Sequence, residues 1–276
     1  MTPAFVDHAR AARSVLLLAN LGLALSSLEW LVPRGKLIKN DLFHPSLDPA
    51  VARAWHSFER FWRPSGLRAV LWLRFSASVA GVAACFQGSP ACCGVASLAA
   101  GVLSLLLRLD EPIGIYLGMD GAEHQLTLAL LSLGVALLLG SHLALTAALA
   151  FVALSALVEY ASAGWVKLLK WRAWARGANL LRVLSSNNFG HPWLAARGAE
   201  HPRLLGALSM AVIALEISMP AALFLPAPAA ECLLLLVLGF HLGCAVIMGF
   251  GTFVWAFAAT FPAILLCRDW LSALLS

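Results

Sequence analysis

The chain has 276 residues, 61% of them hydrophobic and only 12% charged, with a mean hydropathy of +0.84 and a net charge of +5. Soluble domains carry about 25% charged residues, so this composition excludes an ordinary water-soluble protein. It predicts an all-α, polytopic bundle of transmembrane helices, because in lipid each span must satisfy its own backbone hydrogen bonds. The sequence has no long polar block, and we therefore expect one integral membrane domain over residues 1–276.

Eight apolar segments are long enough to cross a bilayer, which takes about 17–25 residues. They are expected at residues 14–32, 67–86, 91–107, 124–139, 143–167, 204–225, 230–250 and 253–267. The first is expected to be a retained helix and not a cleaved signal peptide, because its apolar sequence continues to Val32. The last is short, and we expect a break at Pro262.

The polar segments predict how the chain meets the membrane surface. Amphipathic helices edged with aromatic residues are expected at residues 47–62 and 171–184. Residues 33–68 hold seven Lys and Arg, and residues 168–203 hold six. With eight spans both segments fall on one side, which the positive-inside rule makes cytoplasmic. Because the basic residues cluster beside apolar helices, the positive charge indicates contact with anionic headgroups, and we expect no nucleic-acid partner.

Lys167 is the residue that most strongly indicates chemistry. It ends a run whose positions 143–166 contain only two ionisable side chains, Glu159 and Tyr160. A lysine at membrane depth costs free energy and is usually functional. An amine held away from water also gives up its proton more readily and can act as a base. The alternative is that Lys167 snorkels from the helix end to the interface.

The helix that carries Lys167 has a distinctive face. Tyr160, Ala163, Gly164 and Lys167 follow the spacing i, i+3, i+4, i+7, which places them on one side of a helix. The small residues between Tyr160 and Lys167 would let either a partner helix or a flat ligand approach closely.

Two further ionisable residues lie within apolar segments. Glu216 is in the middle of the sixth segment, where a carboxylate is costly unless it is protonated or paired. It could line a polar site or relay protons, or it could form a structural pair with Arg74. His241, in the seventh segment, could act as an acid–base group or donate to a ligand, or it could bond to a neighbouring helix.

His124 begins the fourth apolar segment. It could belong to the same site, or it could cap the helix together with Asp120 and Glu123. The sequence contains no GxSxG, GxGxxG or HExxH motif, and no paired His or Cys spacing predicts a metal centre. We therefore expect no metal cofactor.

The sequence around Lys167 resembles the HTTM domain, the membrane domain of vitamin K-dependent γ-glutamyl carboxylases and their bacterial relatives. That family has a tyrosine, a small pair ending in glycine and a Lys-Leu on one apolar helix, with a tryptophan and a glycine after it. The matching residues are Tyr160, Ala163, Gly164, Lys167, Leu168, Trp174 and Gly177. Glu216 is similar to an acidic position of the next helix, Phe240-His241-Leu242 to a Phe-His-Leu, and His124 to a histidine after an Asn-rich loop. The resemblance covers about residues 10–265.

The resemblance implies a reaction and a role for each matching residue. In the carboxylases a lysine deprotonates vitamin K hydroquinone, and oxygen then gives a strongly basic quinone oxide. This species removes the γ-proton of a glutamate, the carbanion adds carbon dioxide, and the epoxide is released. By resemblance Lys167 is the base, His124 and His241 polarise quinone oxygens, and Glu216 relays protons. The residues that would bind the cofactor, a reduced quinone, are Tyr160, Gly164 and Trp174.

The carboxylases carry a large soluble domain after the membrane part, and we expect this chain to lack it. We therefore expect a membrane-embedded carboxylase-like lyase or quinol-epoxidising oxidoreductase of the bacterial inner membrane. Its substrate would be a lipid quinol or another small apolar molecule, and a soluble partner protein could replace the missing domain. A non-catalytic carrier or partner subunit of a biosynthetic or secretion system is the main alternative. A metal-dependent membrane oxidase is a third, which would require several histidines to converge.

Overall fold

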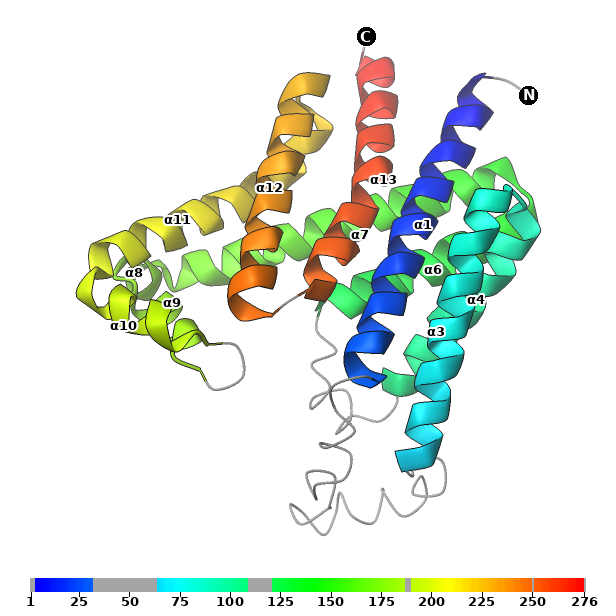
Figure 1. The fold of residues 1–276 in the computed structure, drawn as a ribbon. Helices are drawn as coiled ribbons and strands as arrows, with labels where there is room; N and C mark the ends of the chain where they lie inside the picture. Colours follow the sequence, from blue (N-terminus) through cyan, green and yellow to red (C-terminus); the bar gives the residue numbers. More distant parts are fainter. Residues whose placement is uncertain (1–2, 32–63, 109–120, 187–189, 250, 276) are drawn as a thin grey trace, which may run out of the picture.

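The protein is an all-α bundle of membrane-spanning helices, as its composition predicts (Figure 1). The computed structural model describes residues 3–31, 64–108, 121–186, 190–249 and 251–275. Within these residues eight helices are long and apolar enough to cross a membrane. They are α1 (Pro3–Leu31), α3 (Pro64–Gln87), α4 (Pro90–Arg108), α6 (Gly121–Leu139), α7 (His142–Leu169), α11 (Pro202–Ser218) with its 3-10 continuation η1 (Met219–Leu223), α12 (Ala227–Met248) and α13 (Gly251–Leu275). The amphipathic helix expected at residues 47–62 lies outside the described residues.

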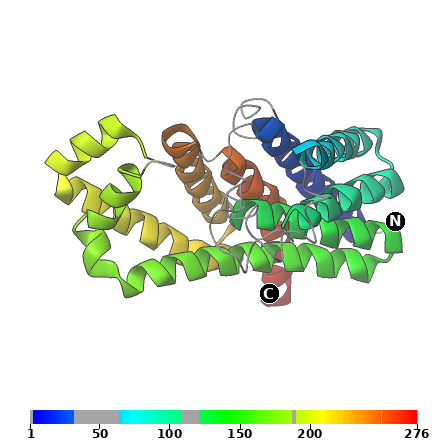
Figure 2. The same ribbon diagram turned by 90° about the horizontal axis from the view of Figure 1, so that it is seen from below.

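Helix α7 links the two parts of the molecule, because it packs against α6 and α13 on one side and against α11 on the other. A short turn at Gly140-Ser141 reverses the chain between α6 and α7, and the Ser141 side chain caps α7 by accepting from the Ala144 amide. Figure 2 shows α7 running along the molecule, from the group formed by α1, α3, α4, α6 and α13 toward the lobe formed by the shorter helices. Helix α11 returns from that lobe and packs against α7. The apolar core is shared among α1, α6, α7 and α13.

The last span is longer than predicted. Helix α13 is continuous over 25 residues and passes through Pro262, so the expected short helix with a break at that residue is wrong. Proline is tolerated inside transmembrane helices because neighbouring helices and local adjustments of the backbone satisfy the affected backbone groups.

The amphipathic segment expected at residues 171–184 is two short helices instead of one. Helix α8 (Trp171–Ala175) and helix α9 (Ala178–Leu184) are separated by Gly177, whose φ is +75°. A side chain would be strained in this left-handed conformation. A Cβ there would also lie 2.7 Å from the Pro202 carbonyl oxygen, so the start of α11 packs directly on this turn. Helix α10 (Pro192–Glu200), which was not predicted, completes the lobe.

A buried polar network joins three of the spans. The Arg74 guanidinium on α3 lies 3.5 Å from the Glu123 carboxylate on α6, and both side chains are almost inaccessible. Arg74 also donates to the Ser27 hydroxyl on α1 at 2.9 Å, and the Ser26 hydroxyl donates to Glu123. The proposed pairing of Arg74 with Glu216 is therefore wrong, because Arg74 is paired with a carboxylate that the sequence offered only as a helix cap.

The Arg74–Glu123 pair should be a strong determinant of stability. We expect Arg74→Met to lower the free energy of unfolding by about 3 kcal/mol, because the buried Glu123 carboxylate loses its guanidinium partner. The double variant Arg74→Met/Glu123→Gln should recover most of this loss. Denaturant unfolding in detergent micelles would measure both. The control is Arg197→Met, which removes an exposed pair with Glu200 and should change little. Additive losses in the double variant would contradict the assignment.

Candidate functional site

Lys167 is paired across two helices. Its Nζ, in the last turn of α7, donates to Oε1 of Glu216 on α11. The Lys167 side chain is 26% exposed, whereas that of Glu216 is only 7% exposed. Lys167 therefore does not simply extend into water, and Glu216 has a partner other than Arg74. The two residues predicted to act as base and proton relay are in direct contact.

Gly164 is what allows these two helices to approach. A Cβ on Gly164 would lie 2.7 Å from Cγ1 of Ile217 and 3.0 Å from Cβ of Glu216, and both distances are shorter than side chains normally tolerate. Of the two alternatives for the small residues on this face, the structure shows the close approach of a partner helix. Helix α11 fills the space beside Gly164, and this positions Glu216 opposite Lys167.

A second polar pair lies deeper in the bundle. The Tyr160 hydroxyl and Nε2 of His241 are joined by a 2.6 Å hydrogen bond between α7 and α12. Both residues are buried, with 4% and 3% of their surfaces exposed. The His241 ring stacks on Phe257 of α13, with centroids 4.5 Å apart and an interplanar angle of 5°. Three helices thus hold this imidazole in one orientation.

Each pair contains one buried polar atom that has no hydrogen-bond partner among the described residues. These atoms are Oε2 of Glu216 and Nδ1 of His241. When the Tyr160 hydroxyl donates to Nε2, a neutral His241 carries its proton on Nδ1. The cluster then offers one donor and one carboxylate oxygen in an otherwise apolar setting, where unpaired polar atoms are costly and often mark a binding site.

The two pairs lie at different depths along α7. Tyr160 and Lys167 are seven residues apart, which is about 10 Å along a helix axis. Gly164 lies between them. Lys167 is the member nearer to the end of the span.

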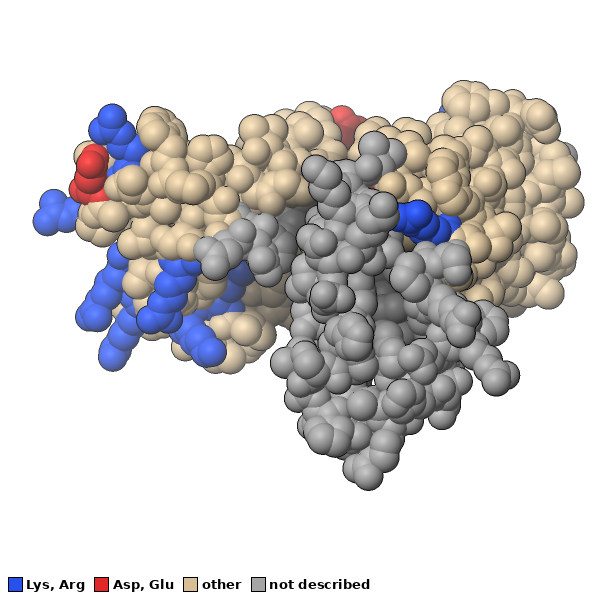
Figure 3. Space-filling view, turned by 60° about the horizontal axis from the view of Figure 1, so that its bottom comes forward, with Lys and Arg blue, Asp and Glu red and all other residues tan. Residues whose placement is uncertain are grey.

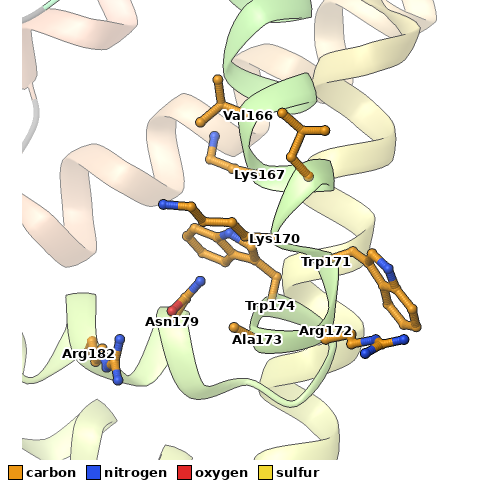
Figure 4. Close-up of a pocket in the computed structure, with 10 residues that line it drawn as sticks. Val166, Lys167, Lys170, Trp171, Arg172, Ala173, Trp174, Asn179 and Arg182 are labelled. Carbon is orange, nitrogen blue, oxygen red and sulfur yellow. The ribbon is translucent and has the colours of Figure 1, made fainter.

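His124 lies apart from both polar pairs, and Trp174 is near Lys167 alone. Gln125, which follows His124, donates to the Val152 carbonyl oxygen on α7. Val152 and Lys167 are about 20 Å apart along the α7 axis, so His124 lies far from Lys167. His124 is exposed there and does not contact Lys167, so its role stays a prediction. Trp174 on α8 lines an open groove of about 760 Å³ that also includes Lys167 (Figure 4).

The structure adds residues that the sequence did not assign to a site. Phe257 follows an apolar pattern that looks like ordinary core, and nothing in the sequence marks it as the platform for His241. Asn179 and Arg182 line the same groove as Lys167, but they are on α9, which only the tertiary packing brings there. Among the described residues, no three His, Cys, Asp or Glu side chains come together in a way that could hold a metal ion.

Comparison with protein-family models, with curated proteins and with solved structures found no match.

The close contact at Gly164 can be tested with a matched pair of substitutions. Gly164→Ala should lower the free energy of unfolding by about 1–3 kcal/mol, because the added methyl group must displace Ile217 or the α11 backbone. Gly239→Ala on α12 is the control, since no atom lies within 4 Å of its Cβ position and alanine favours a helix. Thermal unfolding in detergent measures both. Equal effects of the two substitutions would show that α11 does not pack here as described.

Proposed function

We propose that this chain is a membrane-embedded enzyme with vitamin K-dependent γ-carboxylase-like chemistry, located in a bacterial inner membrane. Lys167 is the base, and the substrate that it deprotonates is a lipid quinol or a similar small apolar molecule. The observation that carries the proposal is the contact between Lys167 and Glu216 at the end of a lipid-spanning helix, two turns from the buried Tyr160–His241 pair.

The Lys167–Glu216 contact supports a role as a base because the carboxylate can accept the proton that the lysine must lose. A protonated lysine cannot accept a proton, so Nζ must first pass one to the carboxylate. The hydrogen bond from Nζ to Oε1 of Glu216 is the path for that proton, and the carboxylate becomes a neutral acid. The neutral amine can then take the proton of a substrate hydroxyl. The net result is transfer of one proton from the substrate to Glu216, with Lys167 as the intermediary.

The residues present fit a reduced quinone. Such a ring is flat and apolar and carries two opposed hydroxyl groups. Nδ1 of His241 is a buried group that can bond to one of them, and the rings of Phe257 and Tyr160 pack against the same imidazole and make its surroundings apolar. When bound, a reduced quinone would supply the electrons for an oxygen-dependent reaction that drives carboxylation or a related step. The chain's own part is to orient the ring and to move the proton.

The surface around Lys167 favours an apolar substrate that arrives through the bilayer. Trp165, Val166 and Leu169 are 57%, 58% and 70% exposed on the same helix end. Apolar side chains of this kind face lipid in a membrane-spanning helix. A lipid-soluble molecule can therefore reach Lys167 from the side without crossing the polar interface.

A non-catalytic carrier or partner subunit is the second candidate, and one observation favours it. Lys167 and Glu216 compensate each other, so the pair could serve only to hold α7 against α11. A soluble partner protein would then supply any activity. The two candidates differ in whether the lysine must lose its proton.

Lys167→Arg separates these roles. Arginine keeps the positive charge and the pairing with Glu216, but it does not deprotonate in proteins. The protein is loaded with a reduced naphthoquinone without oxygen, oxygen is added, and quinone epoxide is followed by mass spectrometry. We expect epoxide from the wild type and a loss of about 10²–10⁴-fold in Lys167→Arg. Thermal stability should be close to that of the wild type.

Arg176→Lys, a conservative exchange at an exposed residue of α8–α9, is the matched control and should keep wild-type activity. Epoxide formation that is equal in Lys167→Arg and wild type would remove Lys167 as the base. No epoxide above the protein-free background, from protein that unfolds cooperatively, would overturn the quinol proposal. Quinone binding without turnover would favour the carrier.

A further inference from the structure

An open groove lies where α7 gives way to the short helices α8 and α9. In Figure 4 the side chains of Lys170, Trp174 and Asn179 face one space, with Arg182 at its edge. The groove has a volume of about 760 Å³ and is also lined by Lys167. It therefore combines three exposed cations, Lys170, Arg172 and Arg182, with two neutral groups that can donate hydrogen bonds, the Trp174 indole N–H and the Asn179 amide. Of the three cations, Arg172 lies over the Trp171 ring.

The charged residues around this groove are almost all basic. Residues 168–203 contain six Lys and Arg but only one acidic residue, Glu200, and that residue pairs with Arg197. Figure 3 shows Lys and Arg gathered over this end of the molecule. The charge of Lys167 is compensated by Glu216. Lys170 and Arg182, in contrast, form no ion pair with any described residue, so the groove itself is positively charged.

The position of the groove relative to the membrane indicates which kind of anion it binds. Val166 and Leu169, at the end of the apolar span, are highly exposed and contact the bilayer. Trp171 and Trp174 follow immediately, and tryptophans at a span end are typical of the level of the lipid headgroups. A groove at this level faces the phosphate layer of the membrane. Lipid phosphate oxygens are strong acceptors for arginine and lysine, and also for neutral N–H donors.

We propose that this groove binds the phosphate of an anionic lipid headgroup, with Lys170 and Arg182 as its charged partners and Trp174 and Asn179 as neutral donors. The acyl chains of that lipid lie along the exposed apolar residues at the end of α7. The site does not depend on the chemistry proposed for Lys167, since its charged partners are other side chains and it requires no reaction. Trp174 is the one member that the resemblance also assigns to the cofactor.

The test compares two double variants that each remove two positive charges from the same lobe. Lys170→Gln/Arg182→Gln alters the groove. Arg176→Gln/Arg203→Gln removes two exposed charges that do not line it. Each purified protein is titrated in detergent with phosphatidylglycerol and with phosphatidylcholine, and native mass spectrometry counts the bound lipids. A parallel titration uses inorganic phosphate as competitor.

We expect the wild type to prefer phosphatidylglycerol, and the groove variant to bind it about 30-fold more weakly, the effect expected for two interfacial basic residues. The control variant should keep most of the affinity. Equal losses in the two variants would overturn the proposal, because they would indicate a diffuse charge effect. Binding without preference for the anionic lipid would also overturn it. Displacement by millimolar inorganic phosphate would assign the site to a soluble phosphate and overturn the lipid assignment. Matching thermal unfolding of both variants confirms that each is folded.

Discussion

Charge inside the bilayer must be compensated, and the rest of the structure depends on this constraint. Apolar surfaces provide little drive for helices to associate in lipid, because lipid tails are as apolar as leucine. Polar pairs therefore have a large share in deciding which helices become neighbours. Arg74 and Glu123 join α3 to α6, and Lys167 and Glu216 join α7 to α11. The first pair is closed off in the core, whereas the second lies at the edge of the bundle beside an open groove.

Helix α7 connects the packing to the candidate chemistry. One of its faces carries Tyr160, Gly164 and Lys167, and each of the three meets a different requirement. Tyr160 bonds to His241 and fixes its orientation. Gly164 leaves space for α11 to pack closely. This close packing brings the Glu216 carboxylate into contact with Lys167. The glycine thus acts on the site without touching a substrate, because it sets the separation of the helices that carry the polar groups.

The sequence was sufficient to predict the eight spans, because the length of an apolar run is a local property that a bilayer selects directly. The shared face of Tyr160, Gly164 and Lys167 was also predictable from helical spacing. The partners of the charged residues could not be predicted from the sequence. Any carboxylate in the membrane could have paired with Arg74, and only the packing of α3 and of α6 against α1 selects Glu123. The division at Gly177 was missed because the amphipathic pattern continues through it, while the interruption comes from the backbone contact with α11.

The separation of Lys167 and Glu216 along the chain has a consequence for biogenesis. Lys167 is made 49 residues before its partner, which corresponds to roughly 3–10 s of synthesis. During this interval α7 carries a lysine without its carboxylate, and the position of Lys167 near a helix end lets its amine reach the headgroup region. The arrival of α11 then draws the amine inward to Glu216. Pairing therefore requires α11 to have entered the membrane, whereas snorkelling requires α7 alone.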